Sequence, residues 1–225
     1  MSQGPLPRIA LETSVRAASV AVDWGQGAQT RFLEAERAHA SDLLPVLSAL
    51  LEGQAQAKDV GLIAVGTGPG SYTGLRVGIA TAMGLAEASG AQLVGVPSVK
   101  ALAFSHLAPG ECGAVVLDAR GGELYFACYE RSADRLKTLH EPTAILPAKL
   151  GSLLPEQGPI LVDAELVNSD SFSGVANERL VTGKRPSADA VLALGLQHFL
   201  EHGPQSMDDV RPLYLRPFAV RARKR

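Results

Sequence analysis

The stretch GLIAVGTGPGSYTGLRVGIATAMGLAEASG, residues 61–90, decides the fold of this 225-residue chain. It begins with a short apolar run, residues 62–65, which predicts a buried β-strand. A loop with glycine at positions 66, 68 and 70 follows, and a nearly uncharged segment with helical periodicity then extends from Thr73 to Ala88. The stretch therefore predicts a strand, a tight loop and a helix, an arrangement that can present backbone N–H groups to an anion.

Two common phosphate-binding patterns do not match this loop. A P-loop ends in Gly-Lys-Ser/Thr, and residues 61–90 contain no lysine. The dinucleotide pattern requires glycine at its sixth position, where Ser71 or Thr73 stands, depending on which glycine is counted first. The loop is also not a nucleophile elbow, because Pro69 and Thr73 occupy the glycine positions of Gly-x-Ser-x-Gly.

The predicted helix 73–88 is apolar around most of its circumference, whereas a surface helix usually carries one apolar stripe. Two lines of residues follow its axis at a spacing of four, Gly74–Gly78–Ala82 and Arg76–Ala80–Gly84. A glycine inside a helix costs about 1 kcal/mol relative to alanine, a cost that close approach of another element would offset. The helix is therefore either the central core helix of a larger domain, or it packs on its own sheet and also on a partner protein.

The composition excludes several functional classes. A hydrophobic fraction of 46% is enough for a sizeable core, and a net charge of −2 argues against a nucleic-acid binder acting alone. No apolar run reaches membrane-spanning length, and the first ten residues lack the apolar core of a signal peptide. We therefore expect a cytoplasmic protein. Cys112 and Cys128 form no Cys-x-x-Cys pair, which predicts two reduced thiols.

The order of the predicted elements indicates the fold class. Strands at 8–11, 17–24 and 29–36 precede a helix at 42–52. The strand, loop and helix described above follow, and then a strand at 92–96. This is the order of a ribonuclease-H-like lobe, which actin-like ATPases contain twice. We expect an α/β protein with the actin-like ATPase fold and two lobes.

The remainder of the chain predicts a second, smaller lobe. Two strands, 114–118 and 123–130, are joined by Arg120-Gly121-Gly122, a pattern typical of a hairpin. A short helix at 147–154, a strand at 159–162 and a helix at 187–202 complete the list. We expect lobe boundaries of 1–103 and 104–225, with helix 187–202 returning to pack on the first lobe.

Three groups of polar residues each allow two interpretations. His198 and His202 are four residues apart on one predicted helix, but they match no HExxH pattern and lack an evident third ligand, so we expect no metal. The basic tail, residues 211–225, can contact RNA phosphates or simply be solvated. Asp118 and Arg120 follow a strand end and either line a cleft or form an ion pair within the hairpin.

Residues 68–78, GPGSYTGLRVG, resemble the signature of the TsaB family, a subunit of the bacterial machinery that makes threonylcarbamoyladenosine in tRNA. Further matches extend from one end of the chain to the other. They are residues 80–86 (ATAMGLA), residues 11–14 (LETS), His39 with residues 42–45 (DLLP), residues 117–120 (LDAR), residues 122–125 (GELY) and residues 212–216 (PLYLR). The last of these resembles the C-terminal strand of the family.

The resemblance implies an actin-like, two-lobed, cytosolic protein that acts beside a catalytic paralogue, TsaD, and an ATPase, TsaE. TsaD transfers a threonylcarbamoyl group from an adenylate to the adenosine beside the anticodon of tRNAs that read codons beginning with A. The resemblance also implies that tRNA is contacted through the complex, and that the chain forms a homodimer when alone.

Two departures bear on chemistry. By register, Ser98 and Leu102 stand where TsaD carries the two histidines that bind its metal, and these side chains cannot replace two imidazoles. The resemblance therefore implies an accessory subunit without metal and without transfer activity. The family's first-strand aspartate is Glu12 here, which leaves weak nucleotide contact but not efficient hydrolysis. We expect no tightly bound cofactor, with ATP or ADP at the interface with TsaD.

The resemblance places a partner surface on helices 42–52 and 73–88. The residues expected at this TsaD or homodimer interface are Leu43, Leu47, Leu50, Gly74, Val77, Gly78, Thr81, Ala82 and Leu85. Those expected to make weak nucleotide contact are Glu12, Thr13, Ser14, Gly68, Gly70 and Ser71. Two other classes remain as alternatives, a free-standing actin-like ATPase or sugar kinase and, with less support, a metallopeptidase.

Overall fold

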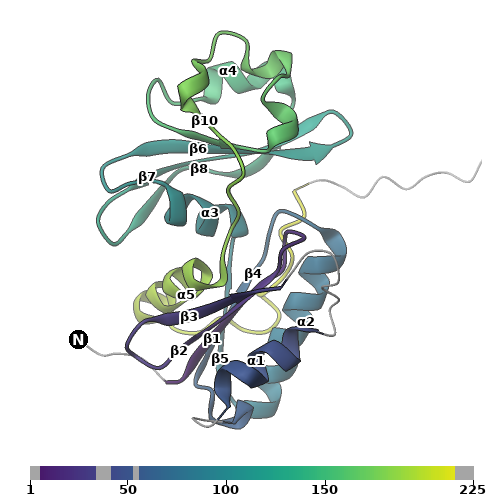
Figure 1. Ribbon diagram of the computed structural model, residues 1–225, viewed down its shortest axis with the longest axis vertical. Coiled ribbons are helices and arrows are strands. Elements are labelled where there is room, and N and C mark those ends of the chain that lie inside the picture. Colours follow the sequence, from purple (N-terminus) through teal and green to yellow (C-terminus); the bar gives the residue numbers. More distant parts are fainter. Residues whose placement is uncertain (1–5, 34–41, 53–55, 216–225) are drawn as a thin grey trace, which may run out of the picture.

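Two five-stranded sheets form the two halves of the molecule, one above the other in Figure 1. The structure is a computed structural model, and it describes residues 6–33, 42–52 and 56–215. His39, Gly53 and residues 216–225 of the tail lie outside these ranges. Among the described residues, no helix combines the length and the apolarity needed to cross a membrane.

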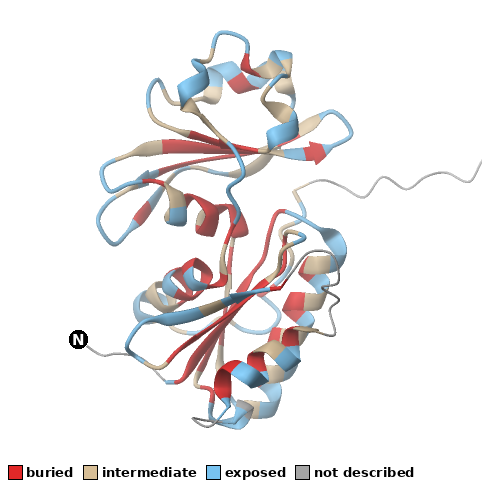
Figure 2. Cartoon of the chain, viewed as in Figure 1, coloured by how far each residue is buried: buried red, intermediate tan, exposed pale blue. Residues whose placement is uncertain are grey.

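The first sheet has the strand order β3-β2-β1-β4-β5. Its strands are β1 (Arg8–Glu12), β2 (Ser19–Asp23), β3 (Ala28–Phe32), β4 (Leu62–Gly66) and β5 (Gln92–Val96). The first three are antiparallel, whereas β1, β4 and β5 are parallel to one another. Strands β1, β2 and β4 are buried along their whole length, and the edge strand β3 is largely exposed (Figure 2). This order confirms the predicted ribonuclease-H-like lobe.

Helices cover both faces of the first sheet. Because side chains alternate along a strand, Ile9 and Leu11 of β1 point to one face and Ala10 to the other. The first face packs against α1 (Leu43–Leu51) and α2 (Tyr72–Ser89). The other face is lined by small residues and packs against α5 (Ala188–His202). A Cβ added at Gly195 of α5 would lie 2.6 Å from the Cβ of Ala64, so this helix approaches the sheet closely.

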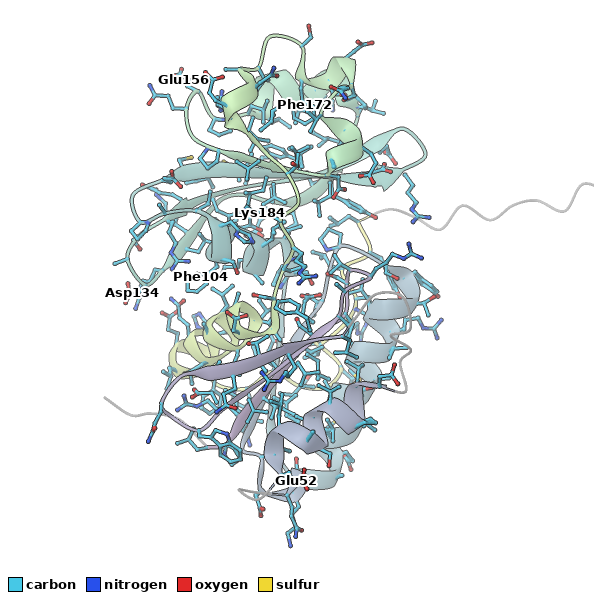
Figure 3. All side chains as sticks on the ribbon, in the orientation of Figure 1. Glu52, Phe104, Asp134, Glu156, Phe172 and Lys184 are labelled. Atoms are coloured by element: carbon cyan, nitrogen blue, oxygen red, sulfur yellow. The ribbon has the colours of Figure 1, made fainter. Side chains whose placement is uncertain are left out.

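The second sheet has the order β10-β9-β6-β7-β8. Its strands are β6 (Cys112–Arg120), β7 (Glu123–Arg131), β8 (Leu136–Ile145), β9 (Ile160–Val162) and β10 (Leu180–Val181). One face packs on α3 (Ser98–His106), and the other is covered by α4 (Leu150–Leu153) and by short turns that include Phe172 (Figure 3). The 3-10 turns are Ala57–Asp59, Pro147–Lys149, Ala164–Leu166, Asp170–Phe172 and Asn177–Arg179. The predicted β6–β7 hairpin is confirmed.

Three features differ from the sequence prediction. Helix α3 was not predicted, although Val99, Leu102 and Ala103 have the i, i+3, i+4 spacing of one helix face and are all buried. Strand β8 was also not predicted, because it contains Pro142 and many polar residues; it lies at the sheet edge, where proline is tolerated. Residues 212–215 form no strand and are joined to the first sheet by the Leu213 N–H, which donates to the Thr67 carbonyl at 2.8 Å.

Candidate functional site

A cavity of about 810 Å³ lies between the two halves of the molecule. Residues from the β1–β2 loop, the start of α2, the tip of the β6–β7 hairpin, the end of β9 and the linker before α5 line it. Those with polar or ring side chains are Ser14, Arg16, Pro69, Ser71, Tyr72, Thr73, Ser98, Asp118, Arg120, Tyr125, Asp163, Lys184 and Pro186. Lys184 lies on the linker that joins the two halves (Figure 3). The cavity therefore receives side chains from both lobes.

The start of α2 is fixed against the β1–β2 loop. Ser71 is the N-cap, and its Oγ accepts a hydrogen bond from the Gly74 N–H at 3.2 Å. The Ser71 N–H donates to the Ser14 carbonyl at 2.7 Å. A Cβ at Gly70 would lie 2.4 Å from that same carbonyl oxygen, so a residue without a side chain is required here. Ser14, Gly70 and Ser71 all line the cavity, and their contact with a nucleotide stays a prediction.

Glu12 lies behind the cavity rather than in it. Its side chain is fully buried, and Oε1 accepts the Ser14 N–H at 2.7 Å. A Cβ at Gly66 would lie 2.2 Å from Oε2 and 2.8 Å from Ser98 Oγ, so these two oxygens both lie against Gly66. Burial raises the pKa of Glu12 above 4.5, and hydrogen bonds from Ser14 and Ser98 partly oppose this shift. The carboxyl group joins the loops beneath the cavity, and its contact with a nucleotide stays a prediction.

Thr13 and Gly68 are also enclosed. Thr13 is 4% exposed, and its hydroxyl donates to the Gly74 carbonyl at 2.8 Å. Gly68 has a φ of +96°, and a Cβ there would lie 2.8 Å from Leu75 Cδ1. Neither residue lines the cavity, and the nucleotide contact predicted for them stays a prediction.

The positions aligned with the TsaD histidines have structural roles. Ser98 Oγ accepts the Gly68 N–H at 3.0 Å, and the Ser98 N–H donates to the Gly68 carbonyl at 2.7 Å. Leu102 is 3% exposed and belongs to the core beneath the second sheet. His198 and His202 lie with their ring centroids 4.9 Å apart. Within the described ranges, no three His, Cys, Asp or Glu side chains gather closely enough to hold a metal ion.

The hairpin tip supplies the opposite wall of the cavity. Asp163 Oδ2 accepts the Asp118 N–H at 2.8 Å, and Asp118 Oδ1 accepts the Arg120 N–H at 2.7 Å. Burial raises the pKa of Asp163. Arg120 has a φ of +60°, which is uncommon for a residue other than glycine, and it follows a shift in the β6–β7 register. Asp118 and Arg120 therefore line the cleft, the first of the two interpretations given above. Sequence reasoning missed Arg16, Asp163 and Lys184, which lie in loops without a recognisable motif.

The structure separates the two lines of α2 residues. A Cβ at Gly78 would lie 2.1 Å from Thr13 Oγ1, and one at Gly74 would lie 2.1 Å from the Thr13 carbonyl oxygen. Ala82 is fully buried. This line therefore packs on β1 and its loop, and the partner contact of Gly74, Gly78 and Ala82 stays a prediction. The close approach indicated by this four-residue spacing is therefore made within the core of the same chain.

The predicted leucines of α1 face the same core. Leu43, Leu47 and Leu50 are each at most 9% exposed and pack with Ile9 and Leu11, and their contact with a partner stays a prediction. Val77, Thr81 and Leu85 are partly exposed, and for them the interface stays a prediction. The exposed surface of α2 is the other line, Arg76–Ala80–Gly84.

Two helix-covered mixed sheets that face each other across a cleft place the chain in the actin-like ATPase class. A family model described as "TsaD: tRNA N6-adenosine threonylcarbamoyltransferase" matches residues 33–205. The chain is 30% identical to the tRNA threonylcarbamoyladenosine biosynthesis protein TsaB of Haemophilus influenzae, over 94% of this chain and 94% of that protein. The chain belongs to the TsaB family.

Two further similarities agree with this assignment. The chain is 26% identical to the tRNA threonylcarbamoyladenosine biosynthesis protein TsaB of Escherichia coli, over 92% of this chain and 94% of that protein. The solved structure of YeaZ from Pseudomonas aeruginosa superposes with a TM-score of 0.77 at 25% identity, over 93% of this chain and 99% of that one. The family predicted from residues 68–78 is thereby confirmed.

Proposed function

We propose that the chain is a non-catalytic subunit of the machinery that makes threonylcarbamoyladenosine in tRNA, acting beside TsaD and the ATPase TsaE. Both TsaB relatives are named as biosynthesis proteins of this modification, which supports the pathway. The matching family model is that of a transferase, but Ser98 and Leu102 replace the expected metal histidines. The absence of two imidazoles at this place supports a scaffold role.

The exposed face of α2 is the observation that carries this proposal. Ala80 and Gly84 are exposed, and nothing lies within 4 Å of a Cβ added at Gly84. On α1, Leu44 is 51% exposed although the other leucines of the helix are more buried. A second helix can pack on such small residues at the short end of the usual spacing of about 8–10 Å. We propose that TsaD docks here, and that a second copy occupies the same face when TsaD is absent.

Gly84→Arg tests the docking face, with Gly151→Arg as the matched control. Both glycines are exposed, lie in helices and have nothing within 4 Å of an added Cβ, so both variants should fold. Overpacking of about 1–3 kcal/mol would weaken TsaD binding about 5- to 150-fold for Gly84→Arg. Circular dichroism checks the fold, and size-exclusion chromatography with TsaD measures association. A folded Gly84→Arg variant that binds TsaD as Gly151→Arg does would contradict the proposal.

The proposal that this chain does not catalyse the transfer has a separate test. The isolated chain, incubated with threonylcarbamoyl-adenylate and unmodified tRNA but without TsaD, should produce no modified adenosine. Modification at a rate like that of the complete set of proteins would show catalysis by this chain. We further propose that tRNA contact is made through the complex: a net charge of −2 gives little counterion release, so the chain alone should need at least about micromolar concentration to shift tRNA.

We propose that ATP or ADP binds only weakly to the lone chain and more tightly when the chain is assembled with TsaD. Ser14, Gly70 and Ser71 offer polar groups at the cavity, while the first-strand carboxylate of Glu12 is enclosed behind it. That position gives no support to a free-standing ATPase or sugar kinase. Isothermal titration with ATP and ADP should show weak binding to the lone chain and tighter binding when TsaD is present. Tight binding to the lone chain, with turnover, would favour the kinase alternative.

A further inference from the structure

The two cysteines of the chain are neighbours in the second sheet. Cys112 begins β6 and Cys128 lies in β7, and their Sγ atoms are 4.0 Å apart. In the antiparallel ladder Ala114 is paired with Cys128 and Cys112 with Glu130, so the two cysteines are diagonal neighbours on one face. A disulfide requires the Sγ atoms at about 2.05 Å, so the thiols must approach by about 2 Å to bond.

The backbone around the pair is suited to such a shift. The register between β7 and β8 changes on both sides of Cys128, and such irregularities interrupt the ladder and bend the strand. Cys112 is the first residue of its strand, directly after a turn at Pro109–Glu111. The irregular register at Cys128 leaves its strand freer to shift than a regular ladder, whereas hydrogen bonds of Gly110 and Glu111 with Arg131 hold the backbone just before Cys112, so the approach is expected to come from Cys128.

We propose that Cys112 and Cys128 are an oxidation site that forms an intrachain disulfide with a peroxide as the oxidant. The Cys112 sulfur attacks one peroxide oxygen, the O–O bond breaks, and with hydrogen peroxide the products are Cys112 sulfenic acid and water. The Cys128 sulfur then attacks the Cys112 sulfur, the S–O bond breaks, and a second water leaves with the thiol proton. In total the two thiols lose two electrons, which reduce the peroxide.

Exposure assigns the two roles. Cys112 is partly exposed, whereas Cys128 is 5% exposed. Burial and the neighbouring Cys112 raise the pKa of Cys128 to about 12, so its thiolate is scarce at neutral pH. Cys112 is therefore the thiol that meets the oxidant, and Cys128 is the one that resolves the sulfenic acid.

The bond would act on the wall of the cleft. Cys112 and Cys128 lie near the base of the β6–β7 hairpin, and the hairpin tip carries Asp118 and Arg120 into the cavity. A covalent link at the base restricts how the two strands move against each other. Oxidation would therefore stiffen the second-lobe wall of the cleft, independently of any partner.

The experiment uses the full chain with reduced thiols. Hydrogen peroxide is added, free thiols are then blocked with N-ethylmaleimide in denaturant, and intact mass is measured. We expect a monomer lighter by two hydrogens with no maleimide, and restoration of two maleimide sites after dithiothreitol. We also expect the oxidised chain to melt about 5–10 °C higher, from the loop that the bond closes.

Single substitutions separate the outcomes. In Cys128→Ser, Cys112 should advance to sulfinic acid, and in Cys112→Ser, Cys128 should remain alkylatable after peroxide treatment. The proposal is overturned if wild-type Cys112 reaches sulfinic acid while Cys128 still takes maleimide, or if the product is a Cys112–Cys112 link between two chains. None of these measurements includes TsaD, so their failure leaves the proposed docking untouched.

Discussion

Replacing Gly78 and Gly84 in turn with alanine tests how α2 is placed. Both residues lie in the same helix, where alanine is favoured over glycine by about 1 kcal/mol. Gly84 is exposed and has nothing within 4 Å of an added Cβ, so Gly84→Ala should raise the free energy of unfolding by the full amount of about 1 kcal/mol. For a chain of this size that gain corresponds to a melting temperature about 2–4 °C higher.

Gly78→Ala should have the opposite effect. The new methyl group would lie 2.1 Å from Thr13 Oγ1 and 3.1 Å from Thr13 Cβ, so Thr13 must move. Overpacking costs about 1–3 kcal/mol. Loss of the hydrogen bond from Thr13 to the Gly74 carbonyl adds about 0.5–1.5 kcal/mol. After the helix gain of about 1 kcal/mol is subtracted, the net destabilisation is about 0.5–3.5 kcal/mol.

The measurement is thermal and urea unfolding of the wild type and both variants, followed by circular dichroism. The two variants should differ by about 1.5–4.5 kcal/mol, with the wild type between them. A Gly78→Ala variant as stable as Gly84→Ala would refute the reasoning, because α2 would then lie farther from the β1–β2 loop than described. TsaD binding by a folded Gly78→Ala variant should be unchanged, since this position faces the core.

Three other predictions concern buried groups. Burial raises the pKa of Glu12, so the folded state favours the protonated acid, and stability falls as pH rises from 4.5 through the folded pKa. Glu12→Gln should therefore gain stability relative to the wild type as pH rises above 4.5, and urea midpoints that move in parallel would contradict this. Asp23→Ala removes the carboxylate that accepts a hydrogen bond from the buried Arg8 guanidinium at 2.9 Å, and a loss of stability of about 1–3 kcal/mol is expected in chemical unfolding. Iodoacetamide should modify Cys112 before Cys128, because burial raises the pKa of Cys128 to about 12; peptide mapping after short exposure that finds Cys128 labelled first would show the opposite accessibility.

The first lobe was predictable because its local patterns agree with its long-range structure. Residues 62–65 form a short apolar run between turn signals, and they are the centre of a sheet covered on both faces. Strand β8 was not predictable in this way, since an edge strand buries few residues and its pattern includes Pro142. Helix α3 has only nine residues and no side-chain hydrogen bond at its N-cap, so its helical spacing from Val99 to Ala103 is a weak signal.

The candidate site was less predictable than the fold. The spacing of Gly74, Gly78 and Ala82 correctly indicated a close approach, but spacing cannot state whether the approaching group belongs to the same chain. Thr13, which precedes Gly74 by 61 residues in the sequence, is that group. Ser14 and Ser71 could be placed at the cavity because they follow strand and loop ends, whereas Lys184 enters it only through the path of the linker.

The position of α5 has a consequence for the order in which the protein is made. This helix covers a face of the first sheet whose strands, β1 to β5, are complete at Val96, yet its own residues come after the entire second lobe. During synthesis the small apolar residues Ala10, Ala64 and Val94 therefore emerge long before Val191 and Leu194 can cover them. A nascent chain with that face open is prone to aggregation until the last helix arrives. The first lobe therefore leaves the ribosome unfinished, and it is completed only after the second lobe and α5 have been translated.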